Sequence, residues 1–164
     1  MTNNAKLATA YHEALHAVIC WRFGVRVPKP TIVPTANSTG FCHHEKIIRG
    51  RYPEADTSNR TRLRMEKCAA IALAGAIAQQ LYKPRSFRNY HGSADYGVAA
   101  EMALRTNETE RAAKAWLRWL EVTTQDQLRE FWAIVDQVAQ KLIEVKTLDA
   151  EQIRCIIFNV REPV

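Results

Sequence analysis

The sequence predicts a mainly α-helical domain of the α+β class, with a small β-hairpin or edge strand near its N-terminus. Three observations predict it. Long stretches are rich in good helix formers and lack proline. One short stretch after the first helix is β-branched and interrupted by prolines. The 164 residues contain no internal repeat and no linker long enough to divide them. We therefore expect residues 1–164 to form a single domain.

The N-terminal third is expected to hold one helix followed by the β element. Ala5 to Phe23 is rich in helix formers, and Gly24 can supply a left-handed stop. The following residues 25–33 are β-branched and punctuated by prolines, and residues 37–40 have the composition of a turn. So many prolines do not fit a central strand, so we expect an edge hairpin.

The rest of the chain is expected to be helical. A very apolar helix should span Thr61 to Tyr82, and Ser93 has the character of an N-cap for a helix through Arg105. Two further helices should follow, ending near residues 121 and 145. The proposed caps of these helices, and the capping box of a last helix to about residue 158, are Thr106 or Asn107, Thr124, and Asp149 with Gln152.

One apolar stripe and the cysteines are expected in the core. Ala112, Ala113, Trp116, Trp119 and Leu120 follow helical spacing, which is typical of a core face. Of the four cysteines, three lie in apolar helical stretches, and none of them form a Cys-x-x-Cys pair. We expect reduced thiols.

Composition excludes several classes of protein. Apolar residues make up 47% and charged residues 24%, which is typical of a folded globular chain and not of a disordered one. The apolar stretches are too short for a membrane span, and the N-terminus lacks the pattern of a secretory signal, so a cytoplasmic protein without membrane contact is expected. The net charge of +6 is diffuse, and nucleic acid is not expected as the main partner.

The first predicted helix contains the motif that carries chemistry. His12-Glu13-Ala14-Leu15-His16 has the form H-E-x-x-H, and residues four apart share one helix face, so both imidazoles can reach one zinc ion. In this motif Glu13 is the general base toward the water at the metal, and it can return the proton to the leaving amine. The apolar flanks of the motif predict a buried helix, in which unpaired polar groups would be costly.

A catalytic zinc site needs a third protein ligand and an open fourth position. Residue 22 is arginine, which excludes the short H-E-x-x-H-x-x-G-x-x-H spacing. From the chemistry of the side chains alone the third ligand stays open among five candidates further along the chain: His43, His44, His91, Asp95 and Glu101.

A resemblance to a known family narrows that choice. Residues 9–18, Thr-Ala-Tyr-His-Glu-Ala-Leu-His-Ala-Val, resemble the zinc-binding segment of the peptidase domain of FtsH-type ATP-dependent proteases. Four further segments resemble that domain in the same order along the chain. They are residues 29–34 with Gly40-Phe41, residues 73–82, residues 92–95, and residues 142–156.

The resemblance implies a zincin-like helical fold in which zinc is held by His12, His16 and Asp95. Three positions depart from the family pattern: Leu15 replaces a glycine, and Gln79 and Gln80 replace an acidic pair. The family's transmembrane segment and its ATPase module are not found, and there is no P-loop motif.

The sequence therefore predicts a zinc-dependent metalloendopeptidase that hydrolyses unfolded or flexible protein segments without an ATPase module of its own. The alternative, motivated by Leu15, Gln79 and Gln80, is a zinc-binding protein-interaction module with little or no peptidase activity. The family's peptidase domains assemble as hexameric rings with the help of their ATPase modules. Both a homo-oligomer and a separately encoded ATPase partner stay open for this chain.

Overall fold

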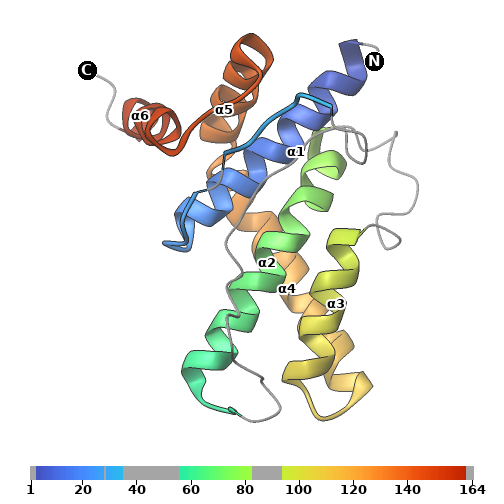
Figure 1. Cartoon of the computed structure of the whole chain (residues 1–164). Helices are drawn as coiled ribbons and strands as arrows, with labels where there is room; N and C mark the ends of the chain where they lie inside the picture. The colour runs from blue at the N-terminus through green and yellow to red at the C-terminus, as the bar shows by residue number, and fades with distance from the viewer. Residues whose placement is uncertain (1–2, 28, 35–55, 83–93, 162–164) are drawn as a thin grey trace.

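The computed structural model describes residues 3–27, 29–34, 56–82 and 94–161, apart from the side chains of residues 3, 4, 76, 78, 79 and 161. This part of the chain is mainly helical, as predicted (Figure 1). The helices are α1 (Asn3–Arg22), α2 (Asn59–Tyr82), α3 (Ala94–Thr106), α4 (Glu110–Glu130), α5 (Trp132–Val145) and α6 (Ala150–Arg161). None of them is long and apolar enough to cross a membrane within the described residues.

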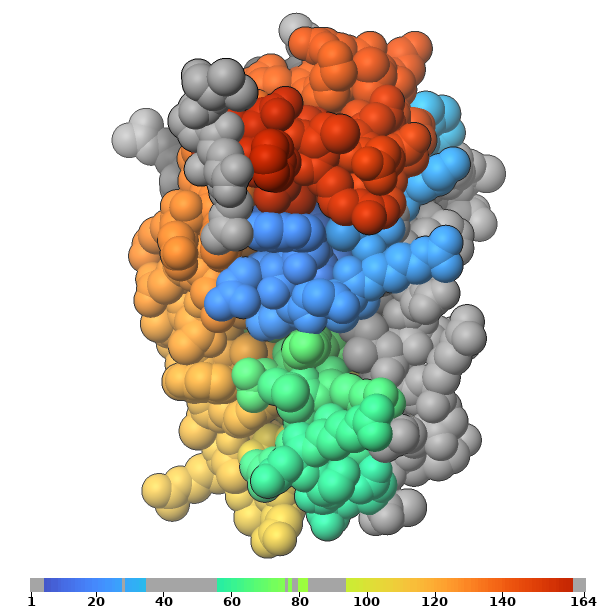
Figure 2. All heavy atoms as spheres, turned by 90° about the vertical axis from the view of Figure 1, so that its left-hand side faces the viewer, coloured from blue at the N-terminus to red at the C-terminus, as the bar shows by residue number. Residues whose placement is uncertain are grey.

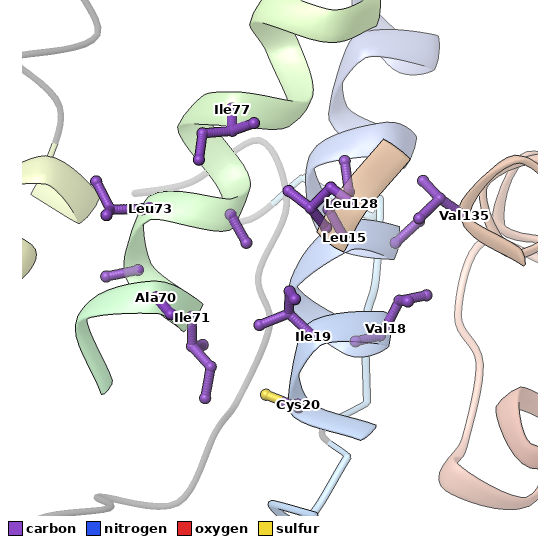
Figure 3. Packing of buried hydrophobic residues seen from close by; sticks show 14 of the residues in the cluster. Leu15, Val18, Ile19, Cys20, Ala70, Ile71, Leu73, Ile77, Leu128 and Val135 are labelled. Atoms are coloured by element: carbon purple, nitrogen blue, oxygen red, sulfur yellow. The ribbon is translucent and has the colours of Figure 1, made fainter. Parts of the chain in front are cut away.

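Helix α1 is the central element. It packs against α2 along one side and against α5 along another, while α3 and α4 pack on α2 (Figure 1). On the face shown in Figure 2, α1 lies between α6 and the first turns of α2. Its buried residues Leu15 and Val18 lie toward Val135 of α5 in the core, whereas Ile19 faces α2, as Figure 3 shows. The helix that carries the H-E-x-x-H motif is therefore held from several sides.

The end of α1 follows the expected glycine stop. Gly24 has a φ of 64°, its N–H donates to Trp21 O at 3.0 Å, and the N–H of Val25 donates to Cys20 O at 2.9 Å. These two bonds form a Schellman motif, which satisfies carbonyl groups that the last turn leaves open. Lys67 of α2 adds a 2.7 Å hydrogen bond to Phe23 O, so the second helix also caps the first.

The β element is much smaller than the predicted hairpin within the described residues. Thr31 forms one antiparallel bridge, and its partner is Thr147, far along the chain. Ile32 N–H donates to Lys146 O at 2.9 Å, and the two threonine hydroxyls lie 2.8 Å apart. The predicted turn at residues 37–40 lies outside the described residues.

The predicted boundary near Thr124 is wrong. Helix α4 begins at the N-cap Thr109, whose hydroxyl accepts from the N–H of Ala112 at 3.1 Å, and it continues through Thr124 to Glu130. Thr124 is buried in the middle of that helix. The break falls instead at Phe131, which is buried and ends the helix with a φ of −95° and a ψ of 13°. Threonine favours N-caps, but burial of a helix face overrides that preference.

Hydrogen bonds and burial decide two other local predictions, the capping box and the core stripe. The capping box is present: the N–H of Gln152 donates to Asp149 Oδ1 at 2.8 Å, and the N–H of Asp149 donates back to Gln152 Oε1 at 2.9 Å. The predicted core stripe is only half correct, because Leu120 is buried but Trp119 is 49% exposed. The N-cap role of Ser93 falls outside the described residues.

Candidate metal centre

His12 and His16 lie on one face of α1, as residues four apart must. Their Nε2 atoms are 3.2 Å apart, and the two rings meet edge to face with centroids 4.7 Å apart at 78°. The side chain of His16 is 6% exposed and that of His12 is 23% exposed. The two histidines therefore form a mostly buried pair with one side open to solvent.

Asp95 completes a group of three from a different helix. It lies in the first turn of α3, and its Oδ2 is 3.4 Å from His12 Nε2 and 3.7 Å from His16 Nε2. Its side chain is 34% exposed. Among the described residues these three side chains are the one group of histidine, cysteine and acidic residues close enough together to hold a metal ion.

The spacing of the three atoms fits a zinc ion. Two ligand atoms about 2.0–2.2 Å from one ion at a tetrahedral angle lie about 3.3–3.6 Å from each other. The three observed edges are 3.2, 3.4 and 3.7 Å. Two imidazole nitrogens and one carboxylate oxygen are a donor set of catalytic zinc sites, which keep the fourth position for water or substrate. Asp95 and His12 are both partly exposed, so the group is in contact with solvent.

Burial and nearby charges shift the pKa values of the two histidines in opposite directions. Desolvation lowers the pKa of His12 to about 4, assisted by the nearby His16 and opposed by Asp95. For His16 burial also lowers the pKa, but the nearby carboxylate of Asp95 and the charge of Glu13 outweigh it and raise the pKa. Without a metal the carboxylate thus favours a proton on the inner ring, while His12 stays neutral.

Glu13 is buried beside this group. It is 3% exposed, and its Oε2 has no hydrogen-bond partner among the described residues. Desolvation raises the pKa of Glu13 to about 7, with His16 lowering it and Asp95 raising it. A buried carboxylate oxygen without a partner is costly, which makes this oxygen a candidate functional group beside the three side chains.

The structure describes two other residues that were considered near the metal site, Glu101 and Cys20, and neither belongs to the group of three. Glu101 is exposed and pairs with Arg105 at 2.7 Å, so it is not part of the group. Cys20 is fully buried, and burial raises the pKa of its thiol to about 12, which fits a packed side chain. His43, His44 and His91 lie outside the described residues.

The three departures from the family pattern also have different positions. Leu15 is fully buried, and Figure 3 shows it near Leu128 of α4, so its bulk is taken up by the core. Gln80 is exposed, and the side chain of Gln79 lies outside the described part. Gly75 was not predicted as a site residue, yet its backbone lies directly against both histidine rings. The signal that points to it is a glycine in the interior of a helix, where alanine is favoured.

No protein-family model matches the chain. The chain is 30% identical over 105 residues to the ATP-dependent zinc metalloprotease FtsH of Rickettsia felis, 63% of this chain and 15% of that protein. It is 35% identical over 83 residues to FtsH of Neorickettsia risticii, 49% of this chain and 12% of the relative. It is 29% identical over 105 residues to the human ATP-dependent zinc metalloprotease YME1L1, 63% of this chain and 13% of the relative.

The matched segment thus spans about an eighth to a sixth of the length of these relatives. All three are zinc metalloproteases by name, and the described residues bring two histidines and an aspartate within metal-binding distance. The chain contains a region that is related to the FtsH-type zinc metalloproteases.

Proposed function

We propose that this protein is a zinc-dependent endopeptidase that cleaves unfolded or flexible protein segments without ATP. The observation that carries the proposal is the triangle of His12 Nε2, His16 Nε2 and Asp95 Oδ2, with edges of 3.2, 3.4 and 3.7 Å. The similarity to zinc metalloproteases supports it.

The three residues of the triangle would hold the ion, and Glu13 would handle the proton. When bound in such a site, zinc polarises a substrate carbonyl and makes a water more acidic. Glu13 is buried next to the ligands and has an oxygen without a partner in the described part of the chain, so it is placed to accept a proton and to release it to the leaving amine. His12 and Asp95 are partly exposed, which leaves the open side of the triangle to an extended peptide.

The first experiment measures zinc content and proteolysis together. Purified protein should contain one zinc per chain by elemental analysis, and it should cleave a denatured casein-like substrate in the absence of ATP. A chelator should abolish cleavage, and added zinc should restore it. Glu13→Gln should keep the zinc and lose at least about 100-fold in cleavage rate, since general acid–base catalysis contributes 10²–10⁴-fold.

Glu101→Gln is the matched control, because it removes a carboxylate of α3 that is exposed and outside the triangle. It should keep both zinc and activity. Full activity of Glu13→Gln would overturn the proposed mechanism. Stoichiometric zinc without cleavage of any denatured substrate at high protein concentration would favour the alternative, a zinc-binding interaction module.

A further inference from the structure

Gly75 occupies a position where its own helix does not call for glycine. It lies in the interior of α2 and is buried. Glycine disfavours a helix interior relative to alanine because it loses more conformational freedom on folding. Among the described glycines only Gly24 has the left-handed φ that favours glycine, so backbone conformation does not explain residue 75. The presence of glycine at residue 75 must therefore be explained by the space available for a side chain there.

The space that a side chain at position 75 would need is filled by the two imidazole rings. A Cβ atom there would lie 2.4 Å from His16 Nε2, 2.5 Å from His12 Cε1 and 2.9 Å from His12 Nδ1. Carbon and nitrogen atoms that are not bonded do not approach so closely, so at least one ring would have to move. The nearest of the three atoms is one of the proposed zinc ligands.

The register of α1 and α2 places this contact in a repeating arrangement. Gly75 and Ile71 are four residues apart on α2, and His12 and His16 are four apart on α1. Burial tends to lower the pKa of both rings, and the backbone of Gly75 beside His12 and that of Ile71 beside His16 oppose this effect. The Nδ1 atoms of both rings are buried, and neither has a hydrogen-bond partner in the described part of the chain. The two rings therefore lie against the bare backbone of α2.

We propose that Gly75 is a positioning residue of the metal centre. Its missing side chain lets both rings approach α2 closely enough for their Nε2 atoms to converge on Asp95 Oδ2. The inference deepens the proposed function and rests on it. Gly97 provides the contrast: it lies two residues after Asp95 in α3, and a Cβ added there would meet nothing within 4 Å. Closeness to the site is therefore not enough to require glycine.

The test compares zinc affinity in Gly75→Ala and Gly97→Ala, measured by competition with a chromophoric chelator. Gly75→Ala should bind zinc at least about 10-fold more weakly than wild type, the loss typical when support of metal-binding histidines is disturbed. The absorption bands of bound Co²⁺ should also change in shape, because one ring is displaced. Gly97→Ala should match wild type in both measurements. Wild-type affinity and an unchanged Co²⁺ spectrum in Gly75→Ala would overturn the proposal.

A second measurement keeps the proposal testable if Gly75→Ala folds poorly. Without metal, Gly75→Ala should lower the Tm of the wild-type background, yet leave the Tm unchanged or raise it in a His12→Ala/His16→Ala background, where the rings are absent. An equal loss in both backgrounds would show that the glycine serves helix packing and would overturn the proposal. A wild type that binds no zinc would overturn the site itself. A zinc-binding wild type beside an equally tight Gly75→Ala would overturn only the role of Gly75.

Discussion

Tyr11 of α1 donates a hydrogen bond to Asp136 of α5, a residue 125 positions further along the chain. The ring of Tyr11 is also stacked between its neighbours, 4.2 Å from the centroid of Tyr82 and 5.6 Å from that of Trp132. Tyr11 directly precedes His12. The contact therefore ties the turn of α1 that carries the first proposed ligand to the end of α2 and to α5.

Removing the hydroxyl should cost stability and spare the metal centre. Tyr11→Phe keeps the stacked ring but loses the hydrogen bond to a carboxylate, so the free energy of unfolding should fall by about 1–3 kcal/mol. Zinc stoichiometry should not change, because the hydroxyl of Tyr11 is bonded to Asp136, which is not one of the three proposed ligands. Urea unfolding of the metal-free proteins measures the loss. Asp136→Asn keeps an acceptor oxygen and should lose less; a loss equal to zero in Tyr11→Phe would contradict the role of the bond.

The same tyrosine should give the protein a step in stability at alkaline pH. Burial raises the pKa of Tyr11 to about 12, and the hydrogen bond to Asp136 and its charge add to the shift. An unfolded tyrosine ionises near pH 10, so the stabilisation is complete below about pH 10 and is lost as the pH rises toward 12. The stability difference between wild type and Tyr11→Phe should therefore shrink across this interval. A constant difference from pH 9 to pH 12 would contradict the prediction.

The cysteines should differ sharply in reactivity. Burial raises the pKa of Cys20 to about 12 and that of Cys68 to about 11, whereas Cys155 is exposed. The thiolate is the reactive form, so at neutral pH Cys155 should be alkylated quickly while Cys20 and Cys68 react only after unfolding. Peptide mapping after a short iodoacetamide pulse distinguishes them. Labelling of Cys20 at the rate of Cys155 in the folded protein would show that the end of α1 opens readily.

Leu15 should matter for stability alone. It is fully buried beside Leu128, so Leu15→Ala should destabilise the protein by about 2–5 kcal/mol through the lost contacts and the cavity left behind. Leu63→Ala, at an exposed position in the first turns of α2, should stay within about 0.5 kcal/mol of wild type. Chelator competition should show the same zinc affinity in both folded variants. A large loss of affinity in Leu15→Ala alone would place this residue in the metal centre after all.

Zinc should stabilise the fold through all three ligands. At a free concentration 100 times its Kd, an ion that binds only the folded state adds about 2.7 kcal/mol to the free energy of unfolding. Asp95→Ala should remove most of this gain and Glu101→Gln none of it. Thermal melts with and without added zinc check both variants. Equal stabilisation of Asp95→Ala and wild type would exclude Asp95 as a ligand.

The sequence predicted the helical class because its signals are local. The glycine stop at Gly24 and the capping box of Asp149 with Gln152 depend on a few neighbouring residues, and both are confirmed. The helix boundary at Thr124 was predicted wrongly, because the same residue type serves as an N-cap or as a buried interior residue depending on tertiary packing. The bridge between Thr31 and Thr147 depends on a contact between distant segments, which no local pattern reports.

The candidate site divides in the same way. The pairing of His12 with His16 follows from helical spacing, whereas the approach of Asp95 depends on how α3 packs against α2, and only the family resemblance pointed to it. Gly75 was missed because the sequence does not show which side chains lie opposite a glycine in an apolar helix. Its role follows only from the two histidine rings that face it. The exposure of Trp119 was missed for a related reason. Helical spacing shows which residues share a helix face, but it does not show whether another element packs on that face.

The ligand triangle draws two of its corners from α1 and the third from α3, 79 positions beyond His16. An extended chain cannot bring these atoms together. A molecule that loses its tertiary structure would therefore lose the proposed zinc site and the proposed peptidase activity. If the proposed function holds, an unfolded copy would be a substrate of the protease and no longer a protease itself. Bound zinc would then mark the correctly folded molecules.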